Sequence, residues 1–259
     1  LQHAAAAVEK GAVAVLWEPA AGLEAPQLPA SVVVHAIPGL SRRVGGIADR
    51  FFREPSAGLD VAGITGTNGK TTTAWLLAQA ADAVGRKGAY LGTIGFGRPG
   101  ALTDAGLTTP DCVSIHRRLA QSRDAGAKTM SVEVSSHALD QGRVDGVRFG
   151  TAVFTNLTRD HLDYHGTLEA YGAAKARLFG SPGLRCAVIN VRDEFGRHLA
   201  DTLDPSLERV LFSTSNDIWA PGDCGWIRVP ELRATTAGLT LQVETSSGAG
   251  TLRSPLIGE

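Results

Sequence analysis

The sequence has 259 residues, 43% of them hydrophobic, with a formal net charge of −1 and a pI near 6.7. This length and composition allow one large domain or two small ones with an ordinary buried core. The near-neutral charge gives neither the basic surface typical of nucleic-acid binding nor the polybasic segment typical of membrane binding, so small-molecule partners are favoured.

Cysteine usage and the chain ends indicate a cytoplasmic protein. Cys112, Cys186 and Cys224 lie far apart and lack the Cys-x-x-Cys spacing of zinc and redox sites. No apolar run approaches the roughly 20 residues that span a bilayer, and the start lacks the order of a signal peptide. Because the sequence begins with Leu1 and stops at Glu259 without a closing secondary-structure element, we expect a piece of a longer protein. We expect that protein to be a monomer.

The first 58 residues predict a small α/β unit that is too short to form a complete hydrophobic core of its own. Its expected elements are a helix over 4–10, strands over 12–16 and 32–34, and a second helix that buries Leu40, Val44, Ala48 and Phe51. Residues 55–58 (Pro-Ser-Ala-Gly) have the composition of a hinge. We therefore predict a partial N-terminal domain over 1–58 and a central domain over 59–259.

Residues 59–73 predict a buried strand, a glycine-rich turn and the start of a helix that runs from Thr72 to Val84 and stops at Gly85. In a phosphate-binding loop of this kind, backbone N–H groups and the positive end of the helix dipole face a polyphosphate. A glycine-rich turn with an incidental lysine is the alternative. The residues expected to bind a nucleotide are Gly66, Thr67, Asn68, Gly69, Lys70, Thr71 and Thr72, with Lys70 at the terminal phosphates and the Thr71 hydroxyl on Mg²⁺.

Strand and helix patterns alternate after the loop, which predicts an α/β fold with a mostly parallel sheet and helices on both faces, as in P-loop ATPases. The expected strands are 88–94, 128–134, 152–155 and 185–190, and the expected helices are 110–124 and 168–179. From Val210 onward, short alternating runs indicate a small antiparallel appendage. Ligands of parallel sheets bind at the carboxyl ends of the strands, so the residues that follow each strand are the site candidates.

Two of these strand ends carry groups that can bind a metal. Glu133 ends the strand at 128–134 and is a candidate Mg²⁺ ligand, with a solvated surface carboxylate as the alternative. After the next strand comes Asn156, followed by two aspartates and two histidines within 160–165. His161 and His165 have the spacing of a zinc helix, but the glutamate after the first histidine is missing, so Mg²⁺ is favoured over zinc hydrolysis.

Lys175 falls on the inward stripe of the helix at 168–179. Snorkelling to the surface, proximity to phosphates and conversion of the amine to a carbamate all remain open. Thr109 is expected to cap the helix at 110–124, with Pro110 in its first turn. Arg143 fits an anionic substrate or an ordinary surface position equally well.

Five motifs, in this order, resemble the Mur ligases. They are Gly66-Thr-Asn-Gly-Lys-Thr, Thr108-Thr-Pro, Glu133-Val-Ser-Ser-His, Asn156-Leu-Thr-Arg-Asp-His-Leu-Asp-Tyr-His-Gly and Tyr171-Gly-Ala-Ala-Lys. Within that family the chain is most similar to the enzymes that add the third amino acid of the peptidoglycan stem peptide. The phosphate loop alone would fit a wider group that includes folylpolyglutamate synthases.

The resemblance implies an ATP-dependent ligase acting on UDP-N-acetylmuramoyl-alanyl-glutamate through an acyl phosphate, with diaminopimelate or lysine as the added amino acid. It assigns catalysis to Lys70, Lys175 and His161, metal binding to Thr71, Glu133, His161 and carbamylated Lys175, nucleotide contact to Asn156, and the muramoyl peptide to Thr108, Thr109, Ser135 and Arg143. ATP and Mg²⁺ are the implied cofactors.

The sequence also departs from the family pattern. The family's Asn-x-Asp-Asp segment is Asn190-Val-Arg192-Asp193 here, so any role of the first aspartate is lost. The early part of the uridine-binding domain and the whole third domain are absent, so we expect the 259-residue chain not to complete the reaction alone. Another ATP-dependent amide ligase, such as a folylpolyglutamate synthase, and a nucleotide-binding module without chemistry are the competing hypotheses.

Overall fold

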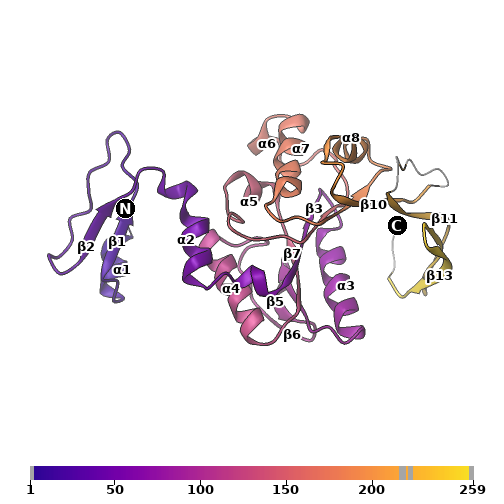
Figure 1. Cartoon of the computed structure of the whole chain (residues 1–259), viewed down its shortest axis with the longest axis horizontal. Helices are drawn as coiled ribbons and strands as arrows, with labels where there is room; N and C mark the ends of the chain where they lie inside the picture. The colour runs from indigo at the N-terminus through magenta and orange to yellow at the C-terminus, as the bar shows by residue number, and fades with distance from the viewer. Residues whose placement is uncertain (1–2, 216–219, 221–223, 257–259) are drawn as a thin grey trace.

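The computed structural model describes residues 3–215, 220 and 224–256, and most of its strands join one sheet (Figure 1). The order in this 11-stranded sheet is β13-β12-β11-β10-β9-β8-β3-β7-β4-β5-β6. Its strands are β3 (Asp60–Thr65), β4 (Gly88–Gly92), β5 (Gly95–Arg98), β6 (Ala101–Thr103), β7 (Thr129–Glu133), β8 (Thr151–Phe154), β9 (Cys186–Asn190), β10 (Glu208–Ser213), β11 (Gly225–Thr235), β12 (Gly238–Thr245) and β13 (Gly248–Ser254).

The middle of the sheet, from β4 across to β11, is parallel, and both edges are antiparallel. The predicted fold class is confirmed. The predicted antiparallel strands after residue 210 are present, and they extend the same sheet because β11 pairs in parallel with β10. The β5–β6 hairpin and β10 were not predicted.

Helices cover both faces of the sheet. Helix α3 (Lys70–Ala83) packs on β3, β4 and β7, where Ala74 and Ala78 join a buried cluster with Ile64 and Tyr90. The larger core lies on the other face and includes residues of α4 (Cys112–Asp124) and of α8 (Glu194–Thr202), which was not predicted. Val61 and Ile64 belong to different clusters because β3 is buried on both faces, as expected for the middle strand of a parallel sheet.

Three short helices gather near the edge of the sheet where the parallel strands end, at the top of Figure 1. They are α5 (Ser136–Asp140), α6 (Leu162–His165) and α7 (Leu168–Ala176), and a 3-10 turn, η3 (Arg177–Gly180), continues α7. Because α5 follows β7 and α6 follows β8, the loops that carry the predicted site residues meet at this edge. No helix in the described ranges is long and apolar enough to cross a membrane.

The N-terminal unit stands at one end of the molecule, on the left of Figure 1. It contains α1 (Ala4–Glu9), the parallel pair β1 (Ala14–Trp17) and β2 (Val33–Ala36), a 3-10 turn η1 (Leu40–Arg42), and α2 (Val44–Phe51), which packs on α4. Ala48 is buried as predicted, but the prediction that Phe51 is buried is wrong, because its side chain is 77% exposed. The buried residues of α2 are Gly45, Ala48 and Asp49, and Phe51 is the last residue of the helix.

The segment predicted as a hinge is a packed 3-10 turn, η2 (Pro55–Gly58). Pro55 and Ser56 are buried, η2 packs on α4, and the Ser56 hydroxyl accepts a hydrogen bond of 3.1 Å from the Arg148 N–H. The turn composition therefore produces a fixed connection to the sheet. The division of the chain at residue 58 stays a prediction.

Candidate active site

The loop between β3 and α3, residues 66–71, has the geometry of a phosphate-binding loop. Gly66 has φ +148°, and a Cβ there would lie 1.9 Å from the Thr155 hydroxyl oxygen, so this position requires glycine. Gly69 has φ +84° and precedes α3, which begins at Lys70, earlier than the predicted Thr72. Among the described residues, no side chain caps α3, which leaves the first N–H groups of the helix available to an anion. Thr72 lies exposed in this first turn.

A second loop, after β8, holds the first in place. Asn156 accepts from the Asn68 N–H through its side chain at 2.9 Å and from the Thr67 N–H through its carbonyl at 2.8 Å. The Thr155 hydroxyl donates to the Asn68 carbonyl at 2.6 Å, and the Thr158 N–H donates to the Thr67 hydroxyl at 2.9 Å. Asn156, predicted to contact the nucleotide, therefore lies directly against the phosphate loop.

Two lysines converge on one carbonyl of this loop. Lys70 Nζ donates to the Gly66 and Thr67 carbonyls, both at 2.9 Å, and Lys175 Nζ donates to the same Gly66 carbonyl at 2.8 Å. Lys175 is only 1% exposed, so the snorkelling alternative is wrong. Its Nζ lies 4.1 Å from the centre of the Tyr171 ring. Loss of hydration, together with the Lys70 charge, lowers the pKa of Lys175 to about 7, and burial also lowers the pKa of Lys70.

Glu133 is fully buried at the end of β7, so the solvated-carboxylate alternative is wrong. Its Oε2 accepts from the Thr71 hydroxyl at 2.8 Å and from the Thr93 hydroxyl at 3.2 Å. Its Oε1 accepts from the Thr93 N–H at 2.9 Å and from the Tyr90 hydroxyl. The two residues predicted to hold Mg²⁺ near the phosphates, Thr71 and Glu133, thus lie in direct contact.

The residues expected to hold the substrate lie beside Glu133. The Thr109 hydroxyl donates to the Glu133 carbonyl at 2.7 Å and accepts from the Ser135 N–H at 3.1 Å. Arg143 donates to the Thr109 carbonyl at 3.1 Å, and the Thr108 hydroxyl lies 3.0 Å from that of Thr93. All four predicted residues therefore gather next to the metal candidate.

Thr109 does not cap α4, as predicted from the sequence, and Pro110 does not lie in its first turn. The helix begins at Cys112, and its N-cap is Asp111, whose carboxylate accepts from the N–H groups of Val113 and Ser114. Thr109 is buried with its hydroxyl engaged by the β7 end, so it is not available as a cap. A second capping residue two positions further on takes the role instead.

His161 lies in an aromatic cluster with His137 and Tyr171. Its ring centre is 4.8 Å from that of His137 and 6.1 Å from that of Tyr171, the ring that Lys175 also contacts. His165 packs on Tyr171 as well, and its Nε2 lies 3.0 Å from the Ser136 hydroxyl. Within the described ranges, no three His, Cys, Asp or Glu residues form a metal-binding group, so the zinc alternative gains no support.

Several residues of the site were not singled out from the sequence. Tyr90 and Thr93 bind the Glu133 carboxylate, and Thr155 binds the phosphate loop. Asp193 accepts from the Leu157 N–H at 2.7 Å and also caps α8, so it fixes the loop after β8. Thr93 and Thr155 each follow a buried strand, the position that identified Glu133, and this signal would have found them.

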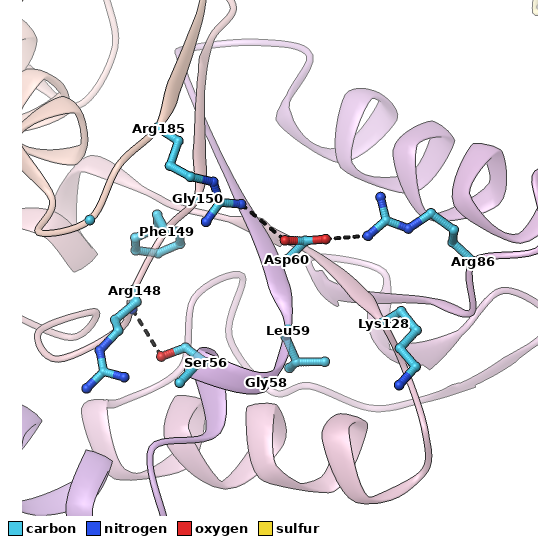
Figure 2. Close-up of a pocket in the computed structure, with 12 residues that line it drawn as sticks. Ser56, Gly58, Leu59, Asp60, Arg86, Lys128, Arg148, Phe149, Gly150 and Arg185 are labelled. Carbon is cyan, nitrogen blue, oxygen red and sulfur yellow. Dashed lines mark hydrogen bonds and ion pairs between the residues drawn. The ribbon is translucent and has the colours of Figure 1, made fainter. Parts of the chain in front are cut away.

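A separate hollow lies at the opposite end of the strands. Figure 2 shows Asp60, the first residue of β3, between the guanidinium groups of Arg86 and Arg185, with Lys128 and Arg148 nearby. Within the described residues, this hollow measures about 580 Å³. A six-residue strand separates it from the phosphate loop by roughly 20 Å. In this hollow the Asp60 carboxylate pairs with Arg86 and Arg185. The hollow is not part of the candidate site.

Comparison with known proteins agrees with these features. The family model described as Mur ligase middle domain matches residues 64–259. The chain is 47% identical over 258 residues to the UDP-N-acetylmuramoyl-L-alanyl-D-glutamate--2,6-diaminopimelate ligase of Xanthomonas campestris pv. campestris, covering 100% of this chain and 50% of that protein. It is 46% identical over 256 residues to the ligase of the same name from Pseudomonas aeruginosa, covering 99% and 51%. The chain spans about half the length of the curated relatives it matches.

Solved structures of Mur ligases are also similar to this chain. A structure of a UDP-N-acetylmuramoyl-L-alanyl-D-glutamate--2,6-diaminopimelate ligase superimposes with a TM-score of 0.81 at 34% identity, covering 98% of this chain and 50% of that one. The Mycobacterium tuberculosis folylpolyglutamate synthase complexed with ADP and AMPPCP has a TM-score of 0.58 at 17% identity, covering 78% and 51%. The second similarity concerns the fold alone.

Proposed function

The chain belongs to the Mur ligase family, and on that premise we propose that the protein containing it joins an amino acid to UDP-N-acetylmuramoyl-L-alanyl-D-glutamate in an ATP-dependent reaction of peptidoglycan synthesis. The observation that carries the proposal is the convergence of two amines, a carboxylate and a hydroxyl on one loop: Lys70 and Lys175 on Gly66, and Glu133 on Thr71. The names of the relatives favour diaminopimelate over lysine as the added amino acid. They also favour this substrate over folate.

ATP would bind with its phosphates in the loop at 66–71, against the start of α3 and Lys70. The donor set suits Mg²⁺, which prefers oxygen ligands. Thr71 and Glu133 supply a hydroxyl and a buried carboxylate in contact with each other, and His161 and Lys175 flank the Tyr171 ring. Bound Mg²⁺ would neutralise charge on the phosphates as the phosphoryl group is transferred.

Lys175 would act as a carbamate. Its burial and lowered pKa supply the neutral amine that addition of CO₂ requires. A bond would form between Nζ and the carbon of CO₂, and one proton would leave the nitrogen for solvent. The product would be an anion next to Lys70, whose charge opposes that of the protonated Lys175 amine. The change would therefore turn a repulsive pair of lysines into an attractive one and add a metal ligand.

The reaction would proceed in two steps. A carboxylate oxygen of the substrate glutamate attacks the γ-phosphorus, the bond to the bridging oxygen breaks, and ADP leaves. The amine of the amino acid then attacks the carbonyl carbon of the acyl phosphate, inorganic phosphate leaves, and the nitrogen loses a proton. Lys70 would stabilise the transferred phosphoryl charge, so catalysis would consist mainly of positioning and charge neutralisation.

Thr108, Thr109, Ser135 and Arg143 would hold the muramoyl peptide, with Arg143 supplying the positive charge that an anionic peptide requires. The position of Thr109 between Glu133 and Ser135 would link the peptide site to the metal site. Residues 1–58 would form part of the domain that binds the uridine end of the substrate, and 59–259 the ATP-binding domain. The protein would act as a monomer in the cytoplasm.

The test is release of phosphate by the intact protein with ATP, Mg²⁺ and the muramoyl dipeptide, with diaminopimelate, with lysine, and with neither. Release that depends on both the dipeptide and diaminopimelate is the expected result. Release that ignores both compounds would leave only a nucleotide-binding protein, and release that requires folate would identify the other ligase.

A further inference from the structure

The two oxygens of the Glu133 carboxylate have different surroundings. Oε1 accepts from two groups on the strand β4 and the residue after its end, the Tyr90 hydroxyl and the Thr93 N–H. Among the residues that the structure describes, Oε2 accepts only from hydroxyls, those of Thr71 and Thr93. A hydroxyl can rotate and offer its oxygen to a cation, whereas a backbone N–H has one fixed direction. Oε1 is therefore the anchored oxygen, and Oε2 is the one that faces the phosphate loop.

Tyr90 reaches Glu133 because of the register of two neighbouring strands. Tyr90 of β4 pairs with Ser131 of β7, so Tyr90, Ser131 and Glu133 lie on the same face, under α3. The Tyr90 ring packs edge-on against Trp75 of α3 at 5.6 Å between ring centres, and its side chain is fully buried. This packing fixes the direction of the hydroxyl toward the carboxyl end of the sheet.

The space around the hydroxyl is closed by Gly92. A Cβ at Gly92 would lie 2.1 Å from Oε1 of Glu133 and 2.4 Å from the Tyr90 hydroxyl, so any larger residue would push the two groups apart. The Ile94 N–H donates to the Tyr90 hydroxyl at 3.4 Å, which directs the hydroxyl proton toward Glu133. Packing, a glycine and a backbone donor therefore all support one hydrogen bond.

We propose that Tyr90 is a positioning residue that holds Oε1 of Glu133 and so leaves Oε2 directed at a divalent cation bound beside Thr71. This inference rests on the proposed function, which supplies the cation and the nucleotide. Tyr90 does not touch either of them. Its role is to keep a buried carboxylate in one orientation before the metal arrives, which lowers the free energy of reorganisation on binding.

The phenol is suited to this role at all physiological pH values. Burial and the adjacent Glu133 carboxylate raise the pKa of Tyr90, so the hydroxyl keeps its proton and remains a donor. Removal of the hydroxyl would leave Oε1 with the Thr93 N–H as its donor and let the carboxylate rotate. Loss of such outer partners of metal ligands typically weakens metal affinity by about 10- to 100-fold.

The test is Tyr90→Phe in the intact protein, which removes the hydroxyl and keeps the ring against Trp75. The measurement is the Mg²⁺ concentration that half-saturates binding of a non-hydrolysable ATP analogue, determined by calorimetry. Ser131→Ala is the matched control, because it removes a buried hydroxyl on the same face that donates to the Ala74 carbonyl at 2.6 Å instead of to Glu133. Melting temperatures report the folding of each variant.

We expect the half-saturating Mg²⁺ concentration to rise about 10- to 100-fold in Tyr90→Phe and to stay within about threefold of wild type in Ser131→Ala. An unchanged value in a folded Tyr90→Phe variant overturns the positioning role alone. Equal increases in Tyr90→Phe and Ser131→Ala overturn the positioning role as well, because loss of any buried hydroxyl on this face would then weaken Mg²⁺ binding. Wild-type analogue binding that does not depend on Mg²⁺ overturns both this inference and the proposed metal site.

Discussion

The burial of Lys175 makes a chemical prediction, because an amine adds to CO₂ only in its neutral form. With a pKa of about 7, roughly three quarters of the Lys175 amines are neutral at pH 7.5, against about one in a thousand for an ordinary lysine with a pKa near 10.4. The structure therefore increases the reactive form by a factor of several hundred. We predict that Lys175 carries a carbamate at neutral pH in the presence of bicarbonate, and that exposed lysines do not.

The assay is carbon-13 NMR of the intact protein equilibrated with labelled bicarbonate. Wild type should give one carbamate resonance, Lys175→Met should lack it, and the control Lys128→Met, at an exposed position, should keep it. A wild-type spectrum without the resonance, or a resonance that persists in Lys175→Met, would refute the reasoning. Turnover should fall with the resonance in Lys175→Met, while binding of an ATP analogue changes little.

Three further predictions concern the loop, pH and α8. Gly66→Ala should weaken ATP-analogue binding roughly 10- to 100-fold, because backbone strain of about 1–3 kcal/mol adds to the clash with the Thr155 hydroxyl, whereas Gly46→Ala, with open space around it, should not. In CO₂-free buffer, the free energy of unfolding of wild type should increase relative to that of Lys175→Met as pH rises from about 7 toward 10. The reason is that over this range the lysine keeps its proton in the unfolded state and has lost it in the folded state. Urea titrations measure this difference, and they would show no such gain if the amine were solvated. Asp193→Ala should lower the free energy of unfolding by about 1–2 kcal/mol, because the α8 cap is lost. It should also weaken binding of the ATP analogue, because the contact with Leu157 is lost. Asp201→Ala on the same helix should change neither the urea titration nor the binding of the analogue.

The fold was predictable where hydrophobic runs are bounded by glycine or polar turns. Strands β3, β7, β8 and β9 and helix α3 were found within a few residues of their observed bounds. The β5 strand was missed because its sequence, Gly-Phe-Gly-Arg, has low strand propensity and is fixed by pairing with β4 and β6. Helix α8 carried a usable signal, an Asp193 cap and an apolar pair at Phe195 and Leu199, that was not used.

The site was predictable at the level of strand ends and not at the level of individual hydrogen bonds. The glycine pattern predicted the phosphate loop, and the carboxyl-end rule selected Glu133 and the loop that begins at Asn156 as candidates. It could not assign Thr109, because the sequence shows two capping residues and the choice is made by the Glu133 carbonyl, 24 positions away. Nor could it identify Tyr90, which reads as an ordinary core aromatic until strand register places it beside Glu133.

Arg192 is a further departure that the structure clarifies. It replaces the first aspartate of the family segment, and its guanidinium donates to the Thr214 hydroxyl at 2.7 Å. The neighbouring Asn190 donates to the Thr155 carbonyl at 2.7 Å, and Asp193 binds the Leu157 N–H. The segment therefore keeps its connection to the loop after β8 through Asn190 and Asp193, while Arg192 is exposed.

The most direct measurement of the central claim follows an oxygen atom. The intact protein would be supplied with ATP, Mg²⁺, diaminopimelate and muramoyl dipeptide whose terminal glutamate carboxylate carries oxygen-18. Attack of that carboxylate on ATP predicts that each phosphate released carries one labelled oxygen, and that release requires the amino acid. Unlabelled phosphate would show that the carboxylate is not the nucleophile, and would contradict the ligase mechanism built on the Lys70, Lys175 and Glu133 cluster.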